Sequence, residues 1–335
     1  MSEAMQVVPA QDERLTWDGA VSLETTKDWV RPWRIPHGDK ELFPPAALIE
    51  RAGMPAGVRL RFATDSTALR LNATPMPAAG KLDVVCNGDL VETIPFAQGA
   101  TAISAGTLPK GRKEIELWLP MTVPVQLASV EISAGASLEK IEDTRPKWIT
   151  YGSSITHCGG AESPAYTWPG IVARECRLNL TCLGFGGNCH LEPNLARLIR
   201  DLPADYISLK VGINIMGGAS LGPRTFLSAV IGFVLIVREG HPDAPLILCS
   251  PILSKPREEK DNPAGLNLTK MRRYIREAVE IFKARGDKNI HYVDGLTLLG
   301  PDHAHLQPDD CHPNAEGYKL LGRNFIREAA EKYFV

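Results

Sequence analysis

The chain has 335 residues, of which 44% are hydrophobic and 23% are charged, and its formal net charge is −2. This length predicts about two domains, and the composition is that of a globular protein with enough apolar residues for a sizeable core. The near balance of charge excludes a global field that attracts nucleic acid or an anionic membrane, so we expect neither as a partner. Residues 1–19 lack the basic start and apolar core of a signal peptide, which predicts a cytoplasmic protein.

Hydrophobic and polar residues alternate with a period of two between residues 55 and 135. In one such segment the predicted inward-facing residues are Val58, Leu60 and Phe62, and the predicted outward-facing ones are Arg59 and Arg61. This pattern is typical of half-buried antiparallel strands, and the dipeptide Asn87-Gly88 between two of them predicts a hairpin. We expect a β-sandwich of the jelly-roll kind over residues 1–143, with one turn of helix at 46–52.

After residue 143 short apolar segments alternate with amphipathic ones. The expected strands lie near residues 147–152, 178–183, 205–211, 245–250 and 289–293. The expected helices lie near residues 168–176, 190–201, 223–239 and 267–285, and a last helix follows Pro313 and runs to the C-terminus. Such alternation predicts right-handed crossovers on a parallel sheet. We therefore expect a three-layer α/β domain over residues 144–335, in which the apolar stretch 226–237 is a buried helix too short to span a bilayer.

The polar residues of interest follow the expected strands, and ligands of open parallel sheets bind outside the carboxyl ends of the strands. Ser154 follows the first strand, and Asp309 and His312 precede the last helix. A serine hydroxyl becomes a nucleophile when a base with a pKa near neutrality takes its proton, and histidine is such a base. A carboxylate three residues before the histidine can fold back onto the ring. The sequence thus predicts a catalytic triad of Ser154, His312 and Asp309.

Acyl transfer also needs hydrogen-bond donors for the oxyanion that develops in the transition state. Gly187 follows the second strand and lacks a Cβ, so its N–H can approach a substrate closely. Asn214 follows the third strand and offers a side-chain amide, and the backbone N–H of Ser154 is the third candidate. We predict that these donors form the oxyanion hole. This chemistry needs no metal and no organic cofactor.

Four segments of the second half together resemble the four sequence blocks of the SGNH (GDSL-like) hydrolase family. They are GSSIT at 152–156, GFGGN at 184–188, VGIN at 211–214 and DDCHPNAEGY at 309–318. The resemblance implies that Ser154 is the nucleophile, that Gly187 and Asn214 help form the oxyanion hole, and that Asp309 and His312 complete the triad. It covers residues 147–333 and implies a flavodoxin-like strand order, 2-1-3-4-5.

The arrangement of a β-region before this domain resembles two-domain members of the family, which include carbohydrate acetyl-esterases and some acyltransferases. One departure is Ser153, which stands where the common GDS block has its aspartate. That aspartate is not the triad member, and the difference indicates the subgroup with a GxSIT block. The resemblance gives no information on the acyl chain length or the oligomeric state.

The resulting functional hypothesis is a serine esterase that hydrolyses a carboxylic ester, such as an acetyl group on a carbohydrate or small polyol, through an acyl-enzyme on Ser154. The first alternative is an acyltransferase that passes the acyl group to an alcohol. A less favoured alternative is a non-catalytic carbohydrate-binding protein. A dinucleotide-binding protein is disfavoured because Cys189 stands where the fingerprint beginning at Gly184 needs a glycine.

Several site residues also have structural interpretations. Ser154 alone could cap a helix, and Gly184 and Gly186 are interpreted as turn glycines. A second DxxH string, Asp302 to His305, competes with the predicted pair, but no helix start follows it. The aromatic residues Trp29, Trp33 and Trp168 are interpreted as core or interdomain packing rather than as a sugar platform.

The seven cysteines show no framework of disulfide spacings, which favours reduced thiols. Cys182, Cys189 and Cys311 lie near the predicted site together with His157. A zinc site would need a CxxC or HxxxH spacing that the sequence lacks, so buried structural cysteines are the preferred interpretation. For His157 we prefer a surface or internally hydrogen-bonded position over contact with substrate.

Overall fold

Two units make up the computed structural model of the protein, which describes residues 4–334. The first unit contains the chain up to Lys40, Ile49–Thr144 and Ser163–Ala165, and the second contains Glu41–Leu48, Arg145–Glu162 and the chain from Tyr166 onward. Two short segments, Glu41–Leu48 and Ser163–Ala165, therefore belong to a different unit from the residues on either side of them in the sequence. The domain limits inferred from the sequence, 1–143 and 144–335, stay a prediction.

Each of these two short segments is hydrogen-bonded to a polar side chain of its own unit. In the first unit the buried carboxylate of Asp83 accepts hydrogen bonds of 2.6 Å from the hydroxyl of Ser163 and from the N–H of Ala165. In the second unit the side-chain amide of Asn194 donates to the carbonyl of Leu42 over 2.8 Å. Each segment is thus held by a polar side chain of the unit to which it belongs.

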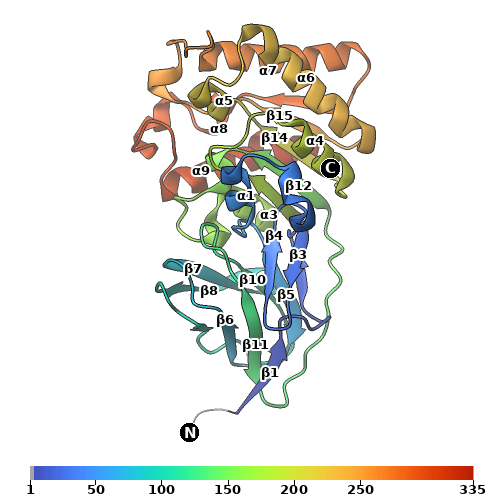
Figure 1. Ribbon diagram of the computed structural model, residues 1–335, viewed down its shortest axis with the longest axis vertical. Coiled ribbons are helices and arrows are strands. Elements are labelled where there is room, and N and C mark those ends of the chain that lie inside the picture. Colours follow the sequence, from blue (N-terminus) through green and yellow to red (C-terminus); the bar gives the residue numbers. More distant parts are fainter. Residues whose placement is uncertain (1–3, 335) are drawn as a thin grey trace. The chain divides into compact units, whose positions relative to one another are not determined.

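The first unit consists of two antiparallel sheets (Figure 1). One sheet has the order β3(Ser22–Thr25), β4(Val30–Trp33), β11(Leu127–Ser133), β6(Leu69–Ala73) and β9(Ala102–Ser104), and β1(Met5–Pro9) also pairs with β11. The other has the order β2(Thr16–Asp18), β5(Arg59–Thr64), β10(Lys113–Trp118), β7(Gly80–Cys86) and β8(Asp89–Phe96). The predicted antiparallel β-region ahead of the α/β domain is confirmed, while the jelly-roll topology stays a prediction.

The turn between β7 and β8 is the two-residue hairpin that the sequence predicts. Asn87 and Gly88 have φ values of 52° and 92°. Both central residues of the turn therefore have positive φ, as a type I′ turn requires, and glycine and asparagine tolerate that conformation best. The short helix α1(Ala46–Ala52) also matches the helical turn expected at 46–52. It is preceded by η1(His37–Leu42).

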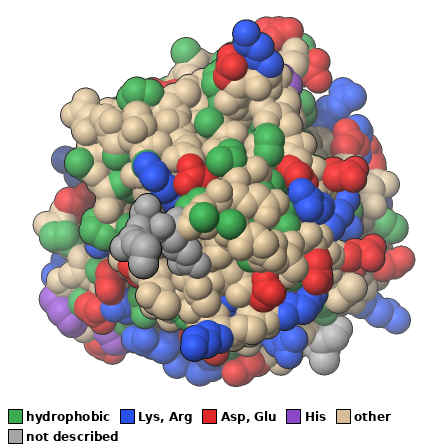
Figure 2. Space-filling view, turned by 90° about the horizontal axis from the view of Figure 1, so that it is seen from below, with side chains coloured by type: hydrophobic (Ala, Val, Ile, Leu, Met, Phe, Trp, Pro, Cys, Tyr) green, Lys and Arg blue, Asp and Glu red, His purple; other side chains and the backbone are tan. Residues whose placement is uncertain are grey.

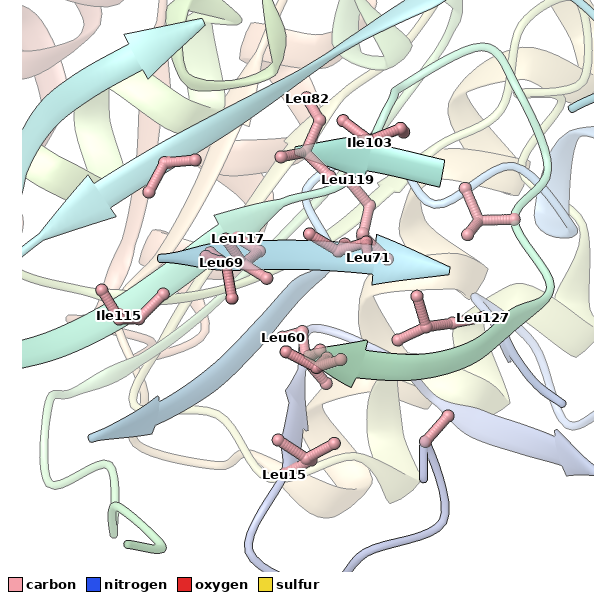
Figure 3. Close-up of a cluster of buried hydrophobic side chains, with 14 of the residues drawn as sticks. Leu15, Leu60, Leu69, Leu71, Leu82, Ile103, Ile115, Leu117, Leu119 and Leu127 are labelled. Atoms are coloured by element: carbon pink, nitrogen blue, oxygen red, sulfur yellow. The ribbon is translucent and has the colours of Figure 1, made fainter. Parts of the chain in front are cut away.

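Apolar side chains from both sheets form the hydrophobic core of the first unit (Figure 3). Leu60 on β5 and Leu117 on β10 come from one sheet, and Leu71 on β6 and Leu127 on β11 come from the other. All four are at most 2% exposed. Alternate residues of each strand point to the same face, so each sheet contributes one apolar face to this core.

The opposite face of β5 is buried as well, which corrects the prediction that Arg59 and Arg61 face outward. Both arginines are at most 3% exposed. The guanidinium of Arg61 lies 2.8 Å from the carboxylate of Asp18 and 2.9 Å from that of Asp143. The guanidinium of Arg59 lies 5.2 Å from the ring centroid of Trp118. Buried charges need such partners, and the period-two pattern does not show whether the polar face has them.

The second unit has a five-stranded parallel sheet covered by helices (Figure 1). The strand order is β13(Asn179–Gly184), β12(Lys147–Gly152), β14(Tyr206–Lys210), β15(Leu246–Cys249) and β16(Ile290–Val293). In sequence order this is 2-1-3-4-5, so the implied strand order and the three-layer α/β fold are confirmed. The five expected strands agree with the observed ones to within two residues at each end.

The helices of this unit include every helix that the sequence predicts. The long ones are α3(Trp168–Glu175), α4(Pro193–Asp201), α6(Pro223–Gly240), α7(Leu268–Ala284) and α9(Ala315–Phe325). The short ones are α2(Ser154–His157), α5(Ile213–Gly218), η3(Lys255–Arg257), α8(Gly295–Leu298), η4(Pro301–Leu306), the π-helical η5(Ile326–Ala330) and α10(Glu331–Tyr333). The short helix η2(Pro164–Tyr166) begins in the segment Ser163–Ala165 of the first unit. Helices η5 and α10 continue α9 and lie within the last helix that the sequence predicts. The other short helices escaped prediction because three to six residues show no full helical period, or only a little more than one.

Strand β12 shows how the helices are divided between the two faces of the sheet. The ring of Trp148 packs against Trp168 on α3 and Phe325 on α9, with centroid distances of 5.8 and 5.5 Å. Three residues later the ring of Tyr151 stacks on Phe233 of α6 at 5.2 Å. Residues an odd number apart on a strand point to opposite faces. Helices α3 and α9 therefore cover one face and α6 covers the other, where it packs between α4 and α7.

Helix α6 buries one face rather than its whole circumference. Phe226, Val230 and Val237 are buried, whereas Leu235 is 53% exposed. The helix that was expected to be buried at 226–237 therefore buries one side and exposes the other to solvent. Within residues 4–334 no helix is long and apolar enough to cross a membrane.

Charged side chains of both signs are interspersed over the face of the molecule in Figure 2, and hydrophobic side chains on it form small separate patches. This distribution agrees with the small net charge of −2. Such a face offers no extended field of one sign to a charged partner.

Gly184, which the sequence analysis interprets as a turn glycine, instead ends β13 and allows close packing. A Cβ at this position would lie 2.4 Å from the backbone N of His157 and 2.5 Å from the carbonyl carbon of Thr156. These are backbone atoms of α2 and cannot move aside as a flexible side chain could. Gly184 therefore lets the helix that begins with Ser154 approach the sheet.

We predict that Gly184→Ala destabilises the protein by about 1–3 kcal/mol, because the added methyl group overpacks the contact between α2 and β13. The matched control is Gly232→Ala in the interior of α6, where a Cβ would have no atom within 4 Å. That change should stabilise by about 0.5–1 kcal/mol through the lower backbone entropy of alanine. Urea unfolding of both variants measures the difference, and equal stabilities would contradict this role of Gly184.

Candidate active site

The candidate nucleophile lies at the start of α2, directly after the central strand β12. Ser153 is the N-cap residue of this helix, and its hydroxyl accepts a hydrogen bond of 3.2 Å from the N–H of Ile155. Ser154 is therefore the first residue of the helix rather than its cap, which leaves its hydroxyl free of a capping role. Ser153, which stands where the GDS block has its aspartate, thus caps the helix that begins at Ser154.

The three side chains predicted as a triad are joined by hydrogen bonds. The Oγ of Ser154 lies 2.8 Å from Nε2 of His312, and Nδ1 of His312 lies 2.6 Å from Oδ2 of Asp309. A carboxylate only accepts, so Nδ1 carries the ring proton and Nε2 is left as the acceptor for the serine hydroxyl. This tautomer is the one that can take a proton from Ser154.

The turn from Asp309 to His312 is built by the same carboxylate. Its Oδ1 accepts hydrogen bonds from the backbone N–H of Cys311 over 3.0 Å and from that of His312 over 2.6 Å. Partial burial raises the pKa of Asp309, but the hydrogen bonds from the His312 ring and from these N–H groups lower it, so the resulting pKa is about 2. The carboxylate is therefore ionised at neutral pH, as the predicted role requires.

A serine from another loop supports this turn. The hydroxyl of Ser254 donates to the carbonyl of Asp310 over 2.7 Å, and the side-chain amide of Gln307 donates to the carbonyl of Cys311 over 3.0 Å. Asp310 has a φ of 58°, which is uncommon for a residue other than glycine. The sequence analysis missed Ser254 because it lies 56 residues from Asp310 in a loop without a recognisable motif.

The predicted oxyanion donors lie in the turn after β13 and at the start of α5. The N–H of Cys189 donates to Oδ1 of Asn214 over 3.1 Å, so the amide oxygen is engaged and the Nδ2 group is the free end. Within residues 4–334 no hydrogen bond uses the N–H of Ser154, the N–H of Gly187 or the Nδ2 of Asn214. Three donors without an internal acceptor are what an oxyanion hole needs.

A buried lysine near this edge was not predicted. Lys210 ends β14 and is 3% exposed. Burial lowers its pKa to about 8, and the nearby thiols of Cys249 and Cys311 counteract part of that shift. Perturbed groups of this kind are frequent at functional sites. The sequence signal is one lysine at the end of the strand YISLK, and it becomes informative only once this strand is known to be buried on both faces.

Three other candidates for the site, namely His157, Trp168 and the string at 302–305, do not join the triad. His157 is buried, and its Nδ1 lies 3.0 Å from the carbonyl oxygen of Gly184. Trp168 is fully buried and donates to the carbonyl of Ile155 over 2.9 Å. The competing string at 302–305 lies in η4 beside a separate cavity of about 370 Å³ and is not bonded to Ser154.

The cysteines and Trp33 also follow the structural interpretation, whereas Trp29 is only partly buried. All seven cysteines are free thiols, and Cys182 and Cys189 are buried, whereas Cys311 is partly exposed. Trp33 is buried and donates its indole N–H to Glu24 over 2.9 Å. A buried indole cannot serve as an exposed platform for a sugar ring.

Comparison with known families agrees with this architecture. Residues 146–327 match the GDSL-like lipase/acylhydrolase family, and residues 15–127 match the N-terminal domain of SsfX3. The first match covers more than half of the chain, so the protein belongs to the GDSL-like lipase/acylhydrolase family. The predicted SGNH (GDSL-like) membership is thus confirmed, and it places the chain among enzymes that hydrolyse or transfer acyl groups.

The chain is similar over its whole length to salicylyl-acyltransferase SsfX3 from a tetracycline biosynthetic pathway, with 37% identity, a TM-score of 0.92, and coverage of 99% of this chain and 98% of that one. A putative GDSL-like lipase from Bacteroides ovatus is 22% identical with a TM-score of 0.80 and the same coverage of both chains. A family two carbohydrate esterase from Clostridium thermocellum is 15% identical with a TM-score of 0.69, over 95% and 98% of the two chains. The last two show the fold alone. No curated protein matches the chain.

The low pKa of Asp309 predicts a pH dependence of stability. The folded-state pKa of about 2 lies below the ordinary aspartate pKa of 3.8, so this group contributes stability that is present above pH 4 and is lost as the pH falls toward 2. Asp309→Asn has no such ionisation. We expect the stability difference between the wild type and Asp309→Asn to shrink as the pH falls from 4 toward 2. Urea unfolding across this range tests the expectation, and a difference that stays constant or grows on acidification would contradict it.

Proposed function

We propose that the protein is a serine esterase that cleaves a carboxylic ester through an acyl-enzyme on Ser154. The observation that carries this proposal is the pair of hydrogen bonds that links Ser154 to His312 and His312 to Asp309, of 2.8 and 2.6 Å. The exposed fractions of the His312 and Asp309 side chains, 45% and 54%, support access of water to the base.

In the proposed reaction the Oγ of Ser154 attacks the ester carbonyl while Nε2 of His312 takes the hydroxyl proton. The oxyanion that forms is stabilised by the N–H groups of Ser154 and Gly187 and by Nδ2 of Asn214. Collapse of the tetrahedral intermediate breaks the C–O bond to the leaving alcohol, which receives the proton from His312. Water, deprotonated by His312, then attacks the acyl-enzyme and releases the carboxylic acid. Asp309 stays ionised throughout and stabilises the imidazolium.

A second candidate function is acyl transfer to an alcohol, and the 37% identity with an acyltransferase over 99% of the chain favours it. Both functions use the same acyl-enzyme and differ only in the group that attacks it. A short acyl group on a carbohydrate or small polyol remains our proposal for the ester substrate, and the aromatic acyl group in the name of SsfX3 makes aryl esters the next class to test.

We expect Ser154→Ala to lower turnover of para-nitrophenyl acetate at least a thousandfold, roughly the effect of losing a triad serine. Asp309→Asn should lower kcat by about 10³–10⁴, because the ring loses the acceptor that fixes its tautomer. The matched control is Ser153→Ala, which removes the neighbouring hydroxyl and one cap bond and should stay within about tenfold of the wild type. Wild-type turnover that survives in Ser154→Ala would refute the proposed nucleophile.

The two acyl acceptors can be distinguished in one experiment. Wild-type protein is incubated with acetyl, butyryl and benzoyl esters of para-nitrophenol, with and without a small polyol, and the acyl products are separated by mass. For an esterase we expect free acid as the main product at every polyol concentration. A new ester that grows with polyol, while release of para-nitrophenol keeps its rate or rises, would assign the protein to acyl transfer.

A further inference from the structure

The second predicted oxyanion donor, the N–H of Gly187, lies in a four-residue turn. The turn runs from Phe185 to Asn188 and is closed by a hydrogen bond of 2.9 Å from the N–H of Asn188 to the carbonyl of Phe185. Gly187, the third residue, has a φ of 74°, whereas Gly186 is not among the glycines with positive φ. This combination fits a type II turn, whose third position favours glycine.

The direction of the Gly187 N–H depends on one peptide plane. In a type I turn the same four residues would keep their ends in place, but the central peptide between Gly186 and Gly187 would be rotated by roughly half a turn. Only one of these two states can point the Gly187 N–H toward an oxyanion. Glycine at position 187 permits the type II state without steric strain, but it does not exclude the other state.

A side chain in the same turn selects between the two states. The Nδ2 of Asn188 donates a hydrogen bond of 2.6 Å to the carbonyl oxygen of Gly186. This carbonyl and the N–H of Gly187 belong to the same trans peptide, so they point in opposite directions. By holding the carbonyl on its own side, Asn188 directs the N–H to the other side. Asn188 is only 6% exposed, so its amide is held in place rather than solvated.

The space beside Gly187 is open. A Cβ added to Gly187 would meet no atom within 4 Å, and no hydrogen bond in residues 4–334 uses the Gly187 N–H. The next residue, Cys189, donates its N–H to Oδ1 of Asn214 and thereby orients the other predicted donor. The turn and the residue directly after it thus set the directions of two of the three predicted donors.

We propose that Asn188 is a positioning residue of the oxyanion hole, which locks the Gly186–Gly187 peptide in the orientation that presents the Gly187 N–H to the reacting carbonyl. The proposal rests on the proposed acyl-enzyme function and adds to it a residue that does not touch the substrate. It requires that Asn188 affects the transition state far more than the binding of the ground state, since only the oxyanion uses the donor fully.

The test compares Asn188→Ala with Asn188→Asp. Asn188→Ala removes the donor to the Gly186 carbonyl, and we expect kcat on para-nitrophenyl acetate to fall about 10- to 100-fold, part of the effect of deleting an oxyanion donor, while KM changes less than about threefold. Asn188→Asp keeps the shape but sets a carboxylate against the same carbonyl, so its kcat should be at least as low. A residue needed only to fill space would tolerate the isosteric aspartate.

The control is Asn194→Ala, which also removes one hydrogen bond from an asparagine amide to a backbone carbonyl, that of Leu42, away from the turn. Its kcat should stay within about twofold of the wild type. The thermal unfolding midpoint of each variant is measured alongside, so a loss of activity that merely reports unfolding is recognised. If Asn188→Ala does not fold, Asn188→Asp decides the question.

A boronic acid that forms a tetrahedral adduct with the serine provides the second readout. Its affinity, measured by calorimetry without turnover, should weaken in the Asn188 variants by a factor similar to the loss in kcat and stay unchanged in Asn194→Ala. A kcat and a boronate affinity in Asn188→Ala within twofold of the wild type would overturn the positioning role and leave the esterase proposal intact. Failure of the wild type to turn over any ester or to bind the boronate would instead count against the proposed function.

Discussion

The candidate site depends on the carboxylate of Asp309, which organises its own turn and the histidine at the same time. One oxygen holds two backbone N–H groups and the other holds the imidazole ring. Because the ring nitrogen that faces the carboxylate must carry the proton, the opposite nitrogen is available to Ser154, which lies 158 residues earlier in the chain. Without this fixed tautomer the serine and histidine would still be neighbours, but no base would face the hydroxyl.

The parallel sheet is what brings these distant residues to one edge. Ser154, Gly187 and Asn214 follow three adjacent strands, β12, β13 and β14, whose order in the sheet places their carboxyl ends side by side. The hydrogen bond from Phe185 to the carbonyl of Gly152, of 2.8 Å, continues the pairing of β13 and β12 up to the turns themselves. Local geometry then adds the detail: Ser153 caps the helix that begins at Ser154, and Gly184 lets that helix approach the sheet.

Much of this could be predicted from the sequence, since period and order are local signals. The alternation of apolar strands and amphipathic helices gave the α/β fold, and four short blocks pointed to the residues that the structure joins or brings to one edge. The rest depends on tertiary contacts. Arg61 can be buried because the carboxylates of Asp18 and Asp143 lie beside its guanidinium. The period-two alternation of apolar and polar residues does not predict these contacts. The functions inferred for Asn188 and Ser254 depend on which carbonyl each side chain reaches, and spacing alone does not specify that.

Hydrolysis and acyl transfer share every group described at the site, so the fold and family do not separate them. Both require a covalent intermediate, which we propose forms on Ser154. The most direct measurement is labelling of the wild-type protein with an organophosphonate ester, followed by mass mapping of the adduct. We predict a single adduct, on Ser154, in the wild type and slower labelling of Ser154 in Asp309→Asn. An adduct on Ser153, on Cys311 or on any other residue would contradict it.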